Sequence, residues 1–343
     1  MSQAVKESIN VIKKKNPYLI RKISKDNHFI LHEATPETAY EKRGISNLRD
    51  FENDFHRIKV IPSEVIDIKG STIIEGDISQ VLKMIPSNSV QCVVTSPPYW
   101  GLRDYKIKGQ IGHEASLPHY ISKLTAIFSD VRRVLKDDGL FWLNIGDGYT
   151  SGNRGWRAPD KKNRARAMSI RPETPEGLKP KDLLGVPWKL AFALQDDGWF
   201  LRSDIIWNKP NAMPESVKDR PTRCHEYIFL FSKSEKYFYE YTAVMEQVNS
   251  HKRNRRTVWD INTLPFPGAH FATFPPSLVE PCILASTRPG DYILDPFFGS
   301  GTVGVVCKDF KRKYVGVELN PAYIKIAIDR LSNGDEKTHK RVG

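Results

Sequence analysis

Cysteine is scarce in this sequence, and its few copies are not arranged to bind a metal. The chain has four cysteines, which lie far apart at Cys92, Cys224, Cys282 and Cys307. No Cys-x-x-Cys pair occurs, so the sequence predicts no zinc site and no other metal site. Cys92 and Cys307 fall within apolar runs, where we expect buried free thiols. Free thiols are typical of the reducing cytoplasm.

Long hydrophobic runs are also missing. No apolar run approaches the ~20 residues that a membrane helix needs, and residues 1–16 contain no apolar core of a secretory signal. We therefore expect a cytoplasmic protein that does not associate with a membrane. Hydrophobic residues still make up 40% of the chain, which is enough for a packed globular core.

Acidic residues are in deficit relative to basic ones. The 40 aspartates and glutamates are outnumbered by 52 lysines and arginines, which gives a formal net charge of +12. This balance favours a polyanionic partner, and nucleic acid is the first candidate. Charge alone also suits an ordinary basic protein, so the interpretation depends on the motifs.

The chain is long enough for one large α/β domain. Residues 1–60 show no obvious strand, and we interpret them as a helical or irregular extension of unknown role. The predicted domain covers residues 61–335, and residues 332–343 form a polar tail. Apolar runs alternate there with amphipathic stretches, which predicts a mostly parallel sheet with helices on both faces. Strands are predicted at 72–75, 90–94, 140–145, 200–207, 227–231, 292–294 and 313–317, and helices at 78–85, 121–135 (with Gly139 near its end), 187–195, 302–310 and 320–331.

Two long stretches interrupt this alternation and are rich in basic residues. Residues 148–181 are dominated by Gly, Pro, Arg and Lys, and the irregular residues 240–268 combine a basic run with Trp259. A basic run beside an aromatic side chain suits a nucleic-acid surface, although an ordinary exposed loop has the same composition. The residues that we expect to contact DNA are Arg154, Arg164, Arg166, Lys209, Arg253, Arg255 and Arg256.

A stiff turn follows the strand predicted at 90–94. The sequence there reads Thr95-Ser96-Pro97-Pro98-Tyr99-Trp100, and its two prolines cannot continue a sheet ladder. A small hydroxyl precedes the prolines and a flat aromatic follows them. In an open α/β sheet the carboxyl ends of the strands carry the working groups. The turn is therefore a candidate site, but taken alone it equally suits an ordinary exit loop.

A second candidate follows the strand predicted at 292–294. The sequence runs Asp295-Pro296-Phe297-Phe298-Gly299-Ser300-Gly301-Thr302 into a helix, and Glu318 ends the next strand. The glycines allow close approach of a ligand, the helix N-terminus offers free N–H groups, and Glu318 is placed to accept hydrogen bonds from a ribose.

The class of ligand that this second segment binds can be narrowed by excluding phosphate-containing ligands. No Gly-Lys-Ser/Thr follows, which excludes a P-loop. Gly304 completes the glycine spacing of a dinucleotide site, but Asp295 would repel a pyrophosphate. An acid at that position suits a ligand with a positive amino group and a ribose, such as S-adenosylmethionine. A glycine-rich turn with a structural acid is the alternative.

Together the two motifs resemble those of the amino-methyltransferases that act on DNA. The tetrapeptide Ser96-Pro97-Pro98-Tyr99 precedes the Asp295–Thr302 segment, which is similar to the order in β-class members of that family. The resemblance implies a Rossmann-like, S-adenosylmethionine-dependent methyltransferase fold. Segments that are similar to further family segments lie at 132–136, 144–147 and 225–231, so the resemblance covers about residues 71–331.

What the resemblance implies is transfer of a methyl group from S-adenosylmethionine to an exocyclic amine of a DNA base. In this family Ser-Pro-Pro-Tyr usually accompanies N4 of cytosine, and Asp-Pro-Pro-Tyr usually accompanies N6 of adenine. Ser96 therefore favours cytosine N4, with adenine N6 as the alternative. Methylation of RNA or of a protein amide is less favoured. A DNA-binding protein whose pocket has lost its catalytic activity is also less favoured.

The chemistry of an exocyclic amine assigns roles within the turn. The target base must leave the duplex before an enzyme can reach it. Ser96 Oγ and the Pro97 carbonyl can accept hydrogen bonds from the amine, Pro98 adds rigidity, and Tyr99 would stack on the base. The amine then attacks the methyl group directly, because no cysteine nucleophile stands in the turn.

The resemblance also suggests a catalytic half over 71–235 and a cofactor half over 270–331. Asp77 is expected near the adenine amino group of the cofactor, while Phe297 and residues 271–276 either line the cofactor pocket or pack structurally. Target recognition would fall to the two basic segments, 148–181 and 240–268. The full set of expected cofactor residues is Asp77, Asp295, Phe297, Gly299, Gly301, Thr302 and Glu318.

Double-stranded DNA is the partner that the resemblance implies. A restriction–modification, phage or orphan setting is a family expectation, in which a cognate restriction endonuclease would act separately. The sequence shows no nuclease-sized region of its own, and it leaves monomer and dimer both open.

Overall fold

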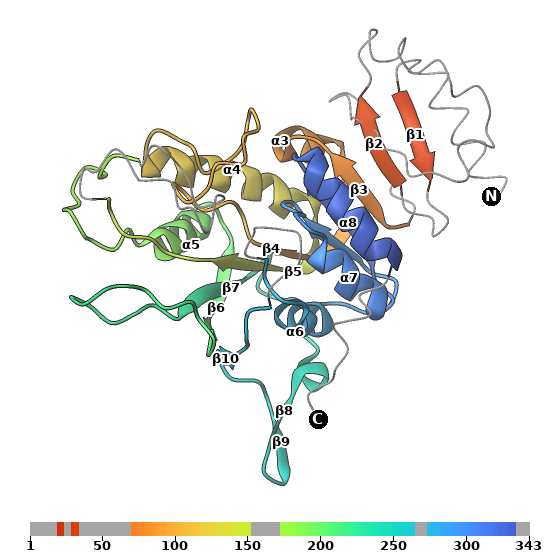
Figure 1. Ribbon diagram of the computed structural model, residues 1–343. Coiled ribbons are helices and arrows are strands. Elements are labelled where there is room, and N and C mark those ends of the chain that lie inside the picture. The colour runs from red at the N-terminus through yellow and green to blue at the C-terminus, as the bar shows by residue number, and fades with distance from the viewer. Residues whose placement is uncertain (1–18, 24–28, 34–69, 152–171, 265–272, 334–343) are drawn as a thin grey trace, which may run out of the picture.

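A ten-stranded sheet runs through the computed structural model, which describes residues 19–23, 29–33, 70–151, 172–264 and 273–333 (Figure 1). The strand order is β1-β2-β3-β12-β11-β4-β5-β7-β6-β10. Neighbouring strands are parallel except in the pairs β1–β2, β5–β7 and β6–β7. The strands are β1 (Leu19–Ile23), β2 (Phe29–Glu33), β3 (Thr72–Glu75), β4 (Val90–Thr95), β5 (Leu135–Ile145), β6 (Phe200–Asn208), β7 (His225–Ser232), β10 (Val258–Asp260), β11 (Tyr292–Asp295) and β12 (Lys313–Glu318).

Helices cover both faces of this sheet (Figure 1). Along β4, Val93 packs with the first helix layer, whereas Cys92 and Val94 pack with the second, as the two-residue period of a strand requires. This arrangement confirms the predicted Rossmann-like α/β fold. The first layer contains α3 (Ile78–Val81), α4 (Leu117–Val134) and α5 (Val186–Asp196), and the second contains α6 (Pro276–Ser286), α7 (Thr302–Asp309) and α8 (Pro321–Asn333).

The predicted strands and helices of the domain are present, with two local differences. The helix expected over 78–85 is split into α3 and a 3-10 turn, η1 (Leu82–Met84). Gly139 does not end α4, which stops at Val134, and instead lies inside β5. A Cβ at Gly139 would come within 2.9 Å of the Gln91 carbonyl of β4, so the close approach of the two strands explains this glycine.

Three regions contain structure that the sequence pattern did not predict. Residues 240–268, expected to be irregular, contain η3 (Tyr241–Val244), β10 and a separate hairpin of β8 (Glu246–Val248) and β9 (His251–Arg253). Helix α6 was not predicted. Strands β1 and β2 pair with each other, and β2 pairs with β3, so a helical or irregular extension is wrong for those strands.

The four cysteines are all free, and Cys92 and Cys307 are buried as expected, whereas Cys224 is exposed. Across the described ranges, no helix is long and apolar enough to cross a membrane. In the same ranges, no group of three or more His, Cys, Asp or Glu side chains could hold a metal ion. The division of the chain at residue 60 and the two proposed halves of the domain stay predictions.

Candidate active site

Two turns that lie 200 residues apart in sequence emerge side by side from the sheet. Strands β4 and β11 are parallel neighbours, with Cys92 opposite Ile293. The Thr95 hydroxyl at the end of β4 donates a hydrogen bond to Asp295 Oδ1 at the end of β11, at 2.6 Å. Since the carboxyl ends of parallel strands share one edge of the sheet, the serine-proline turn and the glycine-rich turn meet there.

The Pro97-Pro98 turn is fixed from below. The buried Tyr120 of α4 donates from its hydroxyl to the Pro98 carbonyl at 2.9 Å. Trp100 is also buried, and its Nε1 donates to the Glu114 carbonyl at 2.9 Å. Trp100 is therefore part of the core beneath the turn, whereas the Tyr99 side of the turn remains half-exposed.

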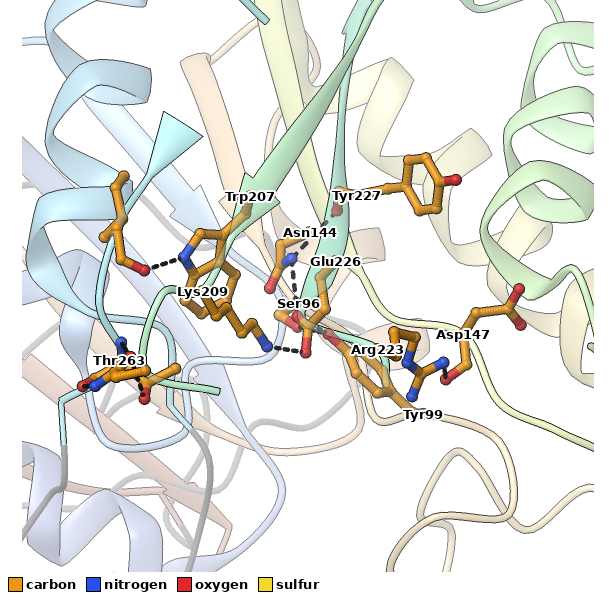
Figure 2. Close-up of polar contacts among 12 residues, drawn as sticks. Ser96, Tyr99, Asn144, Asp147, Trp207, Lys209, Arg223, Glu226, Tyr227 and Thr263 are labelled. Carbon is orange, nitrogen blue, oxygen red and sulfur yellow. Dashed lines mark hydrogen bonds and ion pairs between the residues drawn. The ribbon is translucent and has the colours of Figure 1, made fainter. Parts of the chain in front are cut away.

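A chain of hydrogen bonds leads from the turn to a half-buried carboxylate (Figure 2). The Ser96 hydroxyl donates to the Tyr99 hydroxyl at 3.3 Å, and the Tyr99 hydroxyl donates to Glu226 Oε2 at 2.8 Å. Glu226 comes from β7. The side-chain amide of Asn144, from β5, donates to the same oxygen at 3.1 Å. Lys209, which follows β6, donates to Glu226 Oε1 at 2.5 Å.

Lys209 keeps the Glu226 carboxylate ionised. Burial alone would raise the pKa of Glu226, but the charge and hydrogen bond of Lys209, together with the other donors, lower it below its ordinary value. Burial, reinforced by the charge of Glu226, raises the pKa of Tyr99 well above its ordinary value, so Tyr99 stays a neutral phenol. Lys209 was predicted to contact DNA. Its ammonium points into the site and lies 4.1 Å from the centroid of the Trp207 ring, and DNA contact by Lys209 stays a prediction.

The glycine-rich turn encloses the ring of Phe298. A Cβ on Gly304 would lie 2.8 Å from that ring, and a Cβ on Gly316 of β12 would lie closer still. Gly301 precedes α7 with a φ of 78°, a left-handed conformation that glycine adopts without strain. The packing of Phe298 therefore explains the third glycine of the spacing, with no need for a pyrophosphate.

Two carboxylates flank this turn, the buried Asp295 and the half-buried Glu318. Asp295 is 2% exposed and accepts from the Phe297 N–H at 3.1 Å as well as from Thr95. Glu318 accepts from the Gly299 N–H at 2.8 Å. Burial raises the pKa of Asp295 and that of Glu318 to about 7. Within the described residues, neither carboxylate forms an ion pair with a basic side chain.

Three further residues expected at the cofactor have contacts within the fold. Asp77 caps α3, where its Oδ1 accepts from the N–H and the hydroxyl of the serine two residues on. The Phe297 ring packs edge-on against Phe128, with centroids 6.4 Å apart. The Thr302 hydroxyl accepts from Arg330 at 2.9 Å. Their roles toward a cofactor stay predictions.

Some of the basic residues expected to contact DNA have contacts within the chain, and others lie outside the described residues. Arg253 and Arg256 both pair with Glu246, at 2.7 and 3.3 Å. Arg255 lies over Trp259, 4.6 Å from the ring centroid. These contacts orient the arginines within the chain, and DNA binding by them stays a prediction. Outside the described residues lie Arg154, Arg164 and Arg166, and so do residues 271 and 272 of the segment expected to line the cofactor pocket or to pack structurally.

Sequence reasoning did not single out several residues of this site. Glu226 stands in a segment noted only for its family resemblance. Arg223 donates to the Asp147 carbonyl, and Arg220 lies 3.9 Å over the ring of Tyr149. The sequence did contain one signal for Glu226. It is a carboxylate at the start of an otherwise apolar strand, and such a group needs hydrogen-bond or charged partners when the strand is buried.

Comparison with known proteins identifies the family. A family model described as DNA methylase, N6_N4_Mtase, matches residues 90–329. The Type II methyltransferase M.Cfr9I of Citrobacter freundii is 66% identical over 278 residues, which cover 81% of this chain and 93% of that protein. M.XycI, a Type II methyltransferase of Xanthomonas campestris pv. cyanopsidis, is 67% identical over 274 residues, covering 80% of this chain and 91% of that protein.

A solved structure agrees with the fold. The PvuII DNA methyltransferase, described as cytosine-N4-specific, superposes with a TM-score of 0.59 at 23% identity, over 78% of this chain and 87% of that one. Because the family model spans well over half of the chain and the relatives align over most of it, this chain belongs to the N6/N4 family of DNA methylases, the amino-methyltransferases of DNA.

Proposed function

We propose that the protein transfers a methyl group from S-adenosylmethionine to the N4 amino group of cytosine in double-stranded DNA. One observation carries the proposal: the Thr95–Asp295 hydrogen bond joins the turn that would bind the base to the turn that would bind the methyl donor. Transfer between two bound groups requires this proximity, because the nucleophile must lie about 3–3.5 Å from the methyl carbon.

The residues around the glycine-rich turn fit S-adenosylmethionine. When bound, this cofactor supplies an electrophilic methyl group on a sulfonium. Asp295 is buried and Glu318 is half-buried, and neither carboxylate has a cationic partner among the described residues, which suits a ligand with an amino group and ribose hydroxyls. Gly299 and Gly301 have φ angles of 52° and 78°, and the missing side chain of Gly299 leaves the backbone open to close approach, whereas that of Gly301 makes room for Ala327 and Phe298.

On the other turn, the protein must localise the lone pair of the target amine. Ser96 Oγ and the Pro97 carbonyl accept the two amine hydrogens, which directs the nitrogen lone pair toward the methyl group. The Tyr120 bond to the Pro98 carbonyl holds the turn rigid, so little reorganisation accompanies the reaction. Tyr99 keeps a half-exposed side chain on which a flipped base can stack.

The choice of cytosine depends on Ser96, because a serine at this position accompanies cytosine N4 in the family that the chain resembles. The Type II names of the relatives support a further part of the proposal, a restriction–modification setting with a separate nuclease. Adenine N6 is the competing product, and the test below separates the two.

The test is product analysis. The protein is incubated with duplex DNA and methyl-labelled S-adenosylmethionine, and the DNA is digested to nucleosides. We expect the label in N4-methylcytosine. Label in N6-methyladenine contradicts the base assignment, and label found only in RNA or in protein contradicts the proposed substrate.

A further inference from the structure

We propose that Glu226 and Lys209 are positioning residues that make the Ser96 hydroxyl a hydrogen-bond acceptor toward the target amine. The inference rests on the proposed function, since it assigns a polarity to Ser96 in that reaction. A serine hydroxyl can donate or accept, and only the accepting state draws an amine hydrogen and frees the nitrogen lone pair.

The direction of each hydrogen bond follows from the chemistry of its partners. An ionised carboxylate only accepts, so Glu226 fixes the Tyr99 hydroxyl as a donor toward it. The lone pairs of the Tyr99 oxygen are then free to accept the proton of the Ser96 hydroxyl. With its proton committed inward, Ser96 presents only lone pairs to the base.

Every group around Glu226 enforces the same polarity (Figure 2). Its carboxylate accepts from three donors, Tyr99, Asn144 and Lys209, and the Lys209 ammonium and the Asn144 NH2 can only donate. The space is also tight, because a Cβ on Gly146 would lie 2.8 Å from the Tyr99 ring and 3.2 Å from Glu226 Cγ. The chain therefore has little room to rearrange.

Lys209 is held in place independently of DNA. Its ammonium lies over the ring of Trp207, and the Nε1 of Trp207 is anchored on the Ile261 carbonyl at 2.8 Å. The Lys209 side chain is 17% exposed and the Glu226 side chain 19%. A cation held this way is placed to keep the Glu226 carboxylate ionised.

A glutamine at position 226 would reverse the chain of hydrogen bonds. Its side chain has one accepting end and one donating end. The donating end cannot face the Lys209 ammonium, so it turns toward Tyr99, whose hydroxyl can rotate and accept. Asn144 then loses its hydrogen bond to position 226 and keeps the one to the Tyr227 carbonyl. Tyr99 then donates to Ser96, and Ser96 directs its own proton at the target amine, which is the wrong polarity for methyl transfer.

A double-mutant cycle tests this chain of influence. The single-turnover rate of methyl transfer is measured at saturating cofactor and DNA for the wild type, Glu226→Gln, Tyr99→Phe and the double variant. We expect each single variant to lose about 100-fold in rate, while the double variant is no slower than the slower single one. Cofactor affinity is expected to be unchanged.

Strict additivity in the cycle, or a wild-type rate in Glu226→Gln, overturns the proposal. A second arm restores the polarity: in Glu226→Gln combined with Lys209→Gln, the two amides pair and the position 226 oxygen faces Tyr99 again. We expect that pair to recover several-fold in rate over Glu226→Gln alone. No recovery in a folded protein also contradicts the proposal.

Matched controls separate polarity from packing. Tyr227→Phe removes the hydroxyl of a tyrosine whose ring Figure 2 shows directed away from Ser96, and Asp130→Asn neutralises a carboxylate on α4 that pairs with Arg133 at 3.3 Å. Both should keep the wild-type rate. If Glu226→Gln does not fold, Tyr99→Phe decides, since a wild-type rate there overturns the proposal. Absence of methyl transfer by the wild type would instead contradict the proposed function.

Discussion

The two turns of the candidate site differ in how the protein compensates the charge of their carboxylates. Beside the serine-proline turn, Glu226 is paired with Lys209, and its pKa is lowered. Beside the glycine-rich turn, Asp295 and Glu318 are satisfied only by neutral donors, and burial raises the pKa of each to about 7. The carboxylate beside the serine-proline turn therefore has a cationic partner within the protein, whereas those beside the glycine-rich turn have none among the described residues until a cationic ligand binds.

This difference separates two kinds of function. A site that must hold the same polarity through every turnover is best built from protein charges alone, because preorganised dipoles need no rearrangement at the moment of reaction. A site that must bind and release a cationic ligand gains affinity when its own carboxylate lacks a fixed partner. The predictions below break or sharpen this contrast, from the largest expected effect to the smallest.

Removing the acceptor at the serine-proline turn should cost the most. We expect Ser96→Ala to slow methyl transfer by about 100- to 1,000-fold, because one preorganised polar contact to the reacting group is lost. Cofactor affinity, measured by calorimetry, should stay unchanged because Ser96 is not among the groups expected to hold the cofactor. Ser122→Ala, an exposed serine on α4, is the control. A large loss of cofactor binding in Ser96→Ala would contradict the assignment of Ser96 to the target base, because it would show that Ser96 helps to hold the cofactor.

Neutralising the acid of the glycine-rich turn should have the reverse profile. Asp295→Asn keeps an oxygen for Thr95 and Phe297 but removes the charge, so we expect cofactor affinity to fall by about 10- to 100-fold. The ligand-free protein should become more stable at pH 8, because Asn removes a buried charge. The account is contradicted if the variant binds cofactor as tightly as the wild type.

Cofactor affinity should also depend on pH. The folded-state pKa of Asp295 is raised from 3.8 to about 7, so the carboxylate is largely neutral at pH 6 and largely charged at pH 8. A cationic ligand favours the charged form, so affinity should rise about tenfold over that range. Without ligand, stability should fall as pH rises from about 4 to 7 and then level off. A pH-independent affinity in the wild type, measured beside Asp295→Asn, would rule out this linkage.

Glu318 should contribute less than Asp295. It is expected to accept hydrogen bonds from neutral ribose hydroxyls, so we expect Glu318→Gln to weaken cofactor binding by about 3- to 10-fold. The single-turnover rate at saturating cofactor should be preserved. A loss of rate with intact cofactor binding would assign Glu318 to the chemistry instead. The measurement pairs calorimetry with single-turnover kinetics.

The smallest effect is expected from the β8–β9 region. Arg253 and Arg256 share Glu246, so their net charge is partly neutralised, and Arg255 lies on Trp259. Replacing all three by glutamine should weaken DNA binding modestly and reduce the slope of log K against log salt by less than about 0.9 per arginine. An unchanged slope removes this region from the DNA interface.

Local patterns in the sequence were enough to predict the strands and helices that position the two turns. Period-two and period-3.6 hydrophobic patterns are local, and the prolines of the first turn and the glycines of the second mark element ends directly. The resemblance of the two motifs implied that the two turns act together, and the Thr95–Asp295 hydrogen bond brings them side by side. The β4–β11 pairing supplies the physical cause of this proximity.

The rest of the site depends on contacts that no local pattern contains. Glu226 meets Asn144 and Lys209 only through the antiparallel register of β7 with β5 and β6. The β8–β9 hairpin has little apolar alternation and is held across its strands by the pairing of Glu246 with Arg253. Helix α6 carries an internal Pro281, which masks its helical period.

The central claim is methylation of cytosine N4 by a site that depends on Ser96. The most direct measurement is sequencing and nucleoside mass spectrometry of DNA from cells that express the wild type or Ser96→Ala. The account predicts N4-methylcytosine at one recurring sequence in the wild type and its near absence in the variant. N6-methyladenine in its place, or equal modification by both proteins, would contradict it.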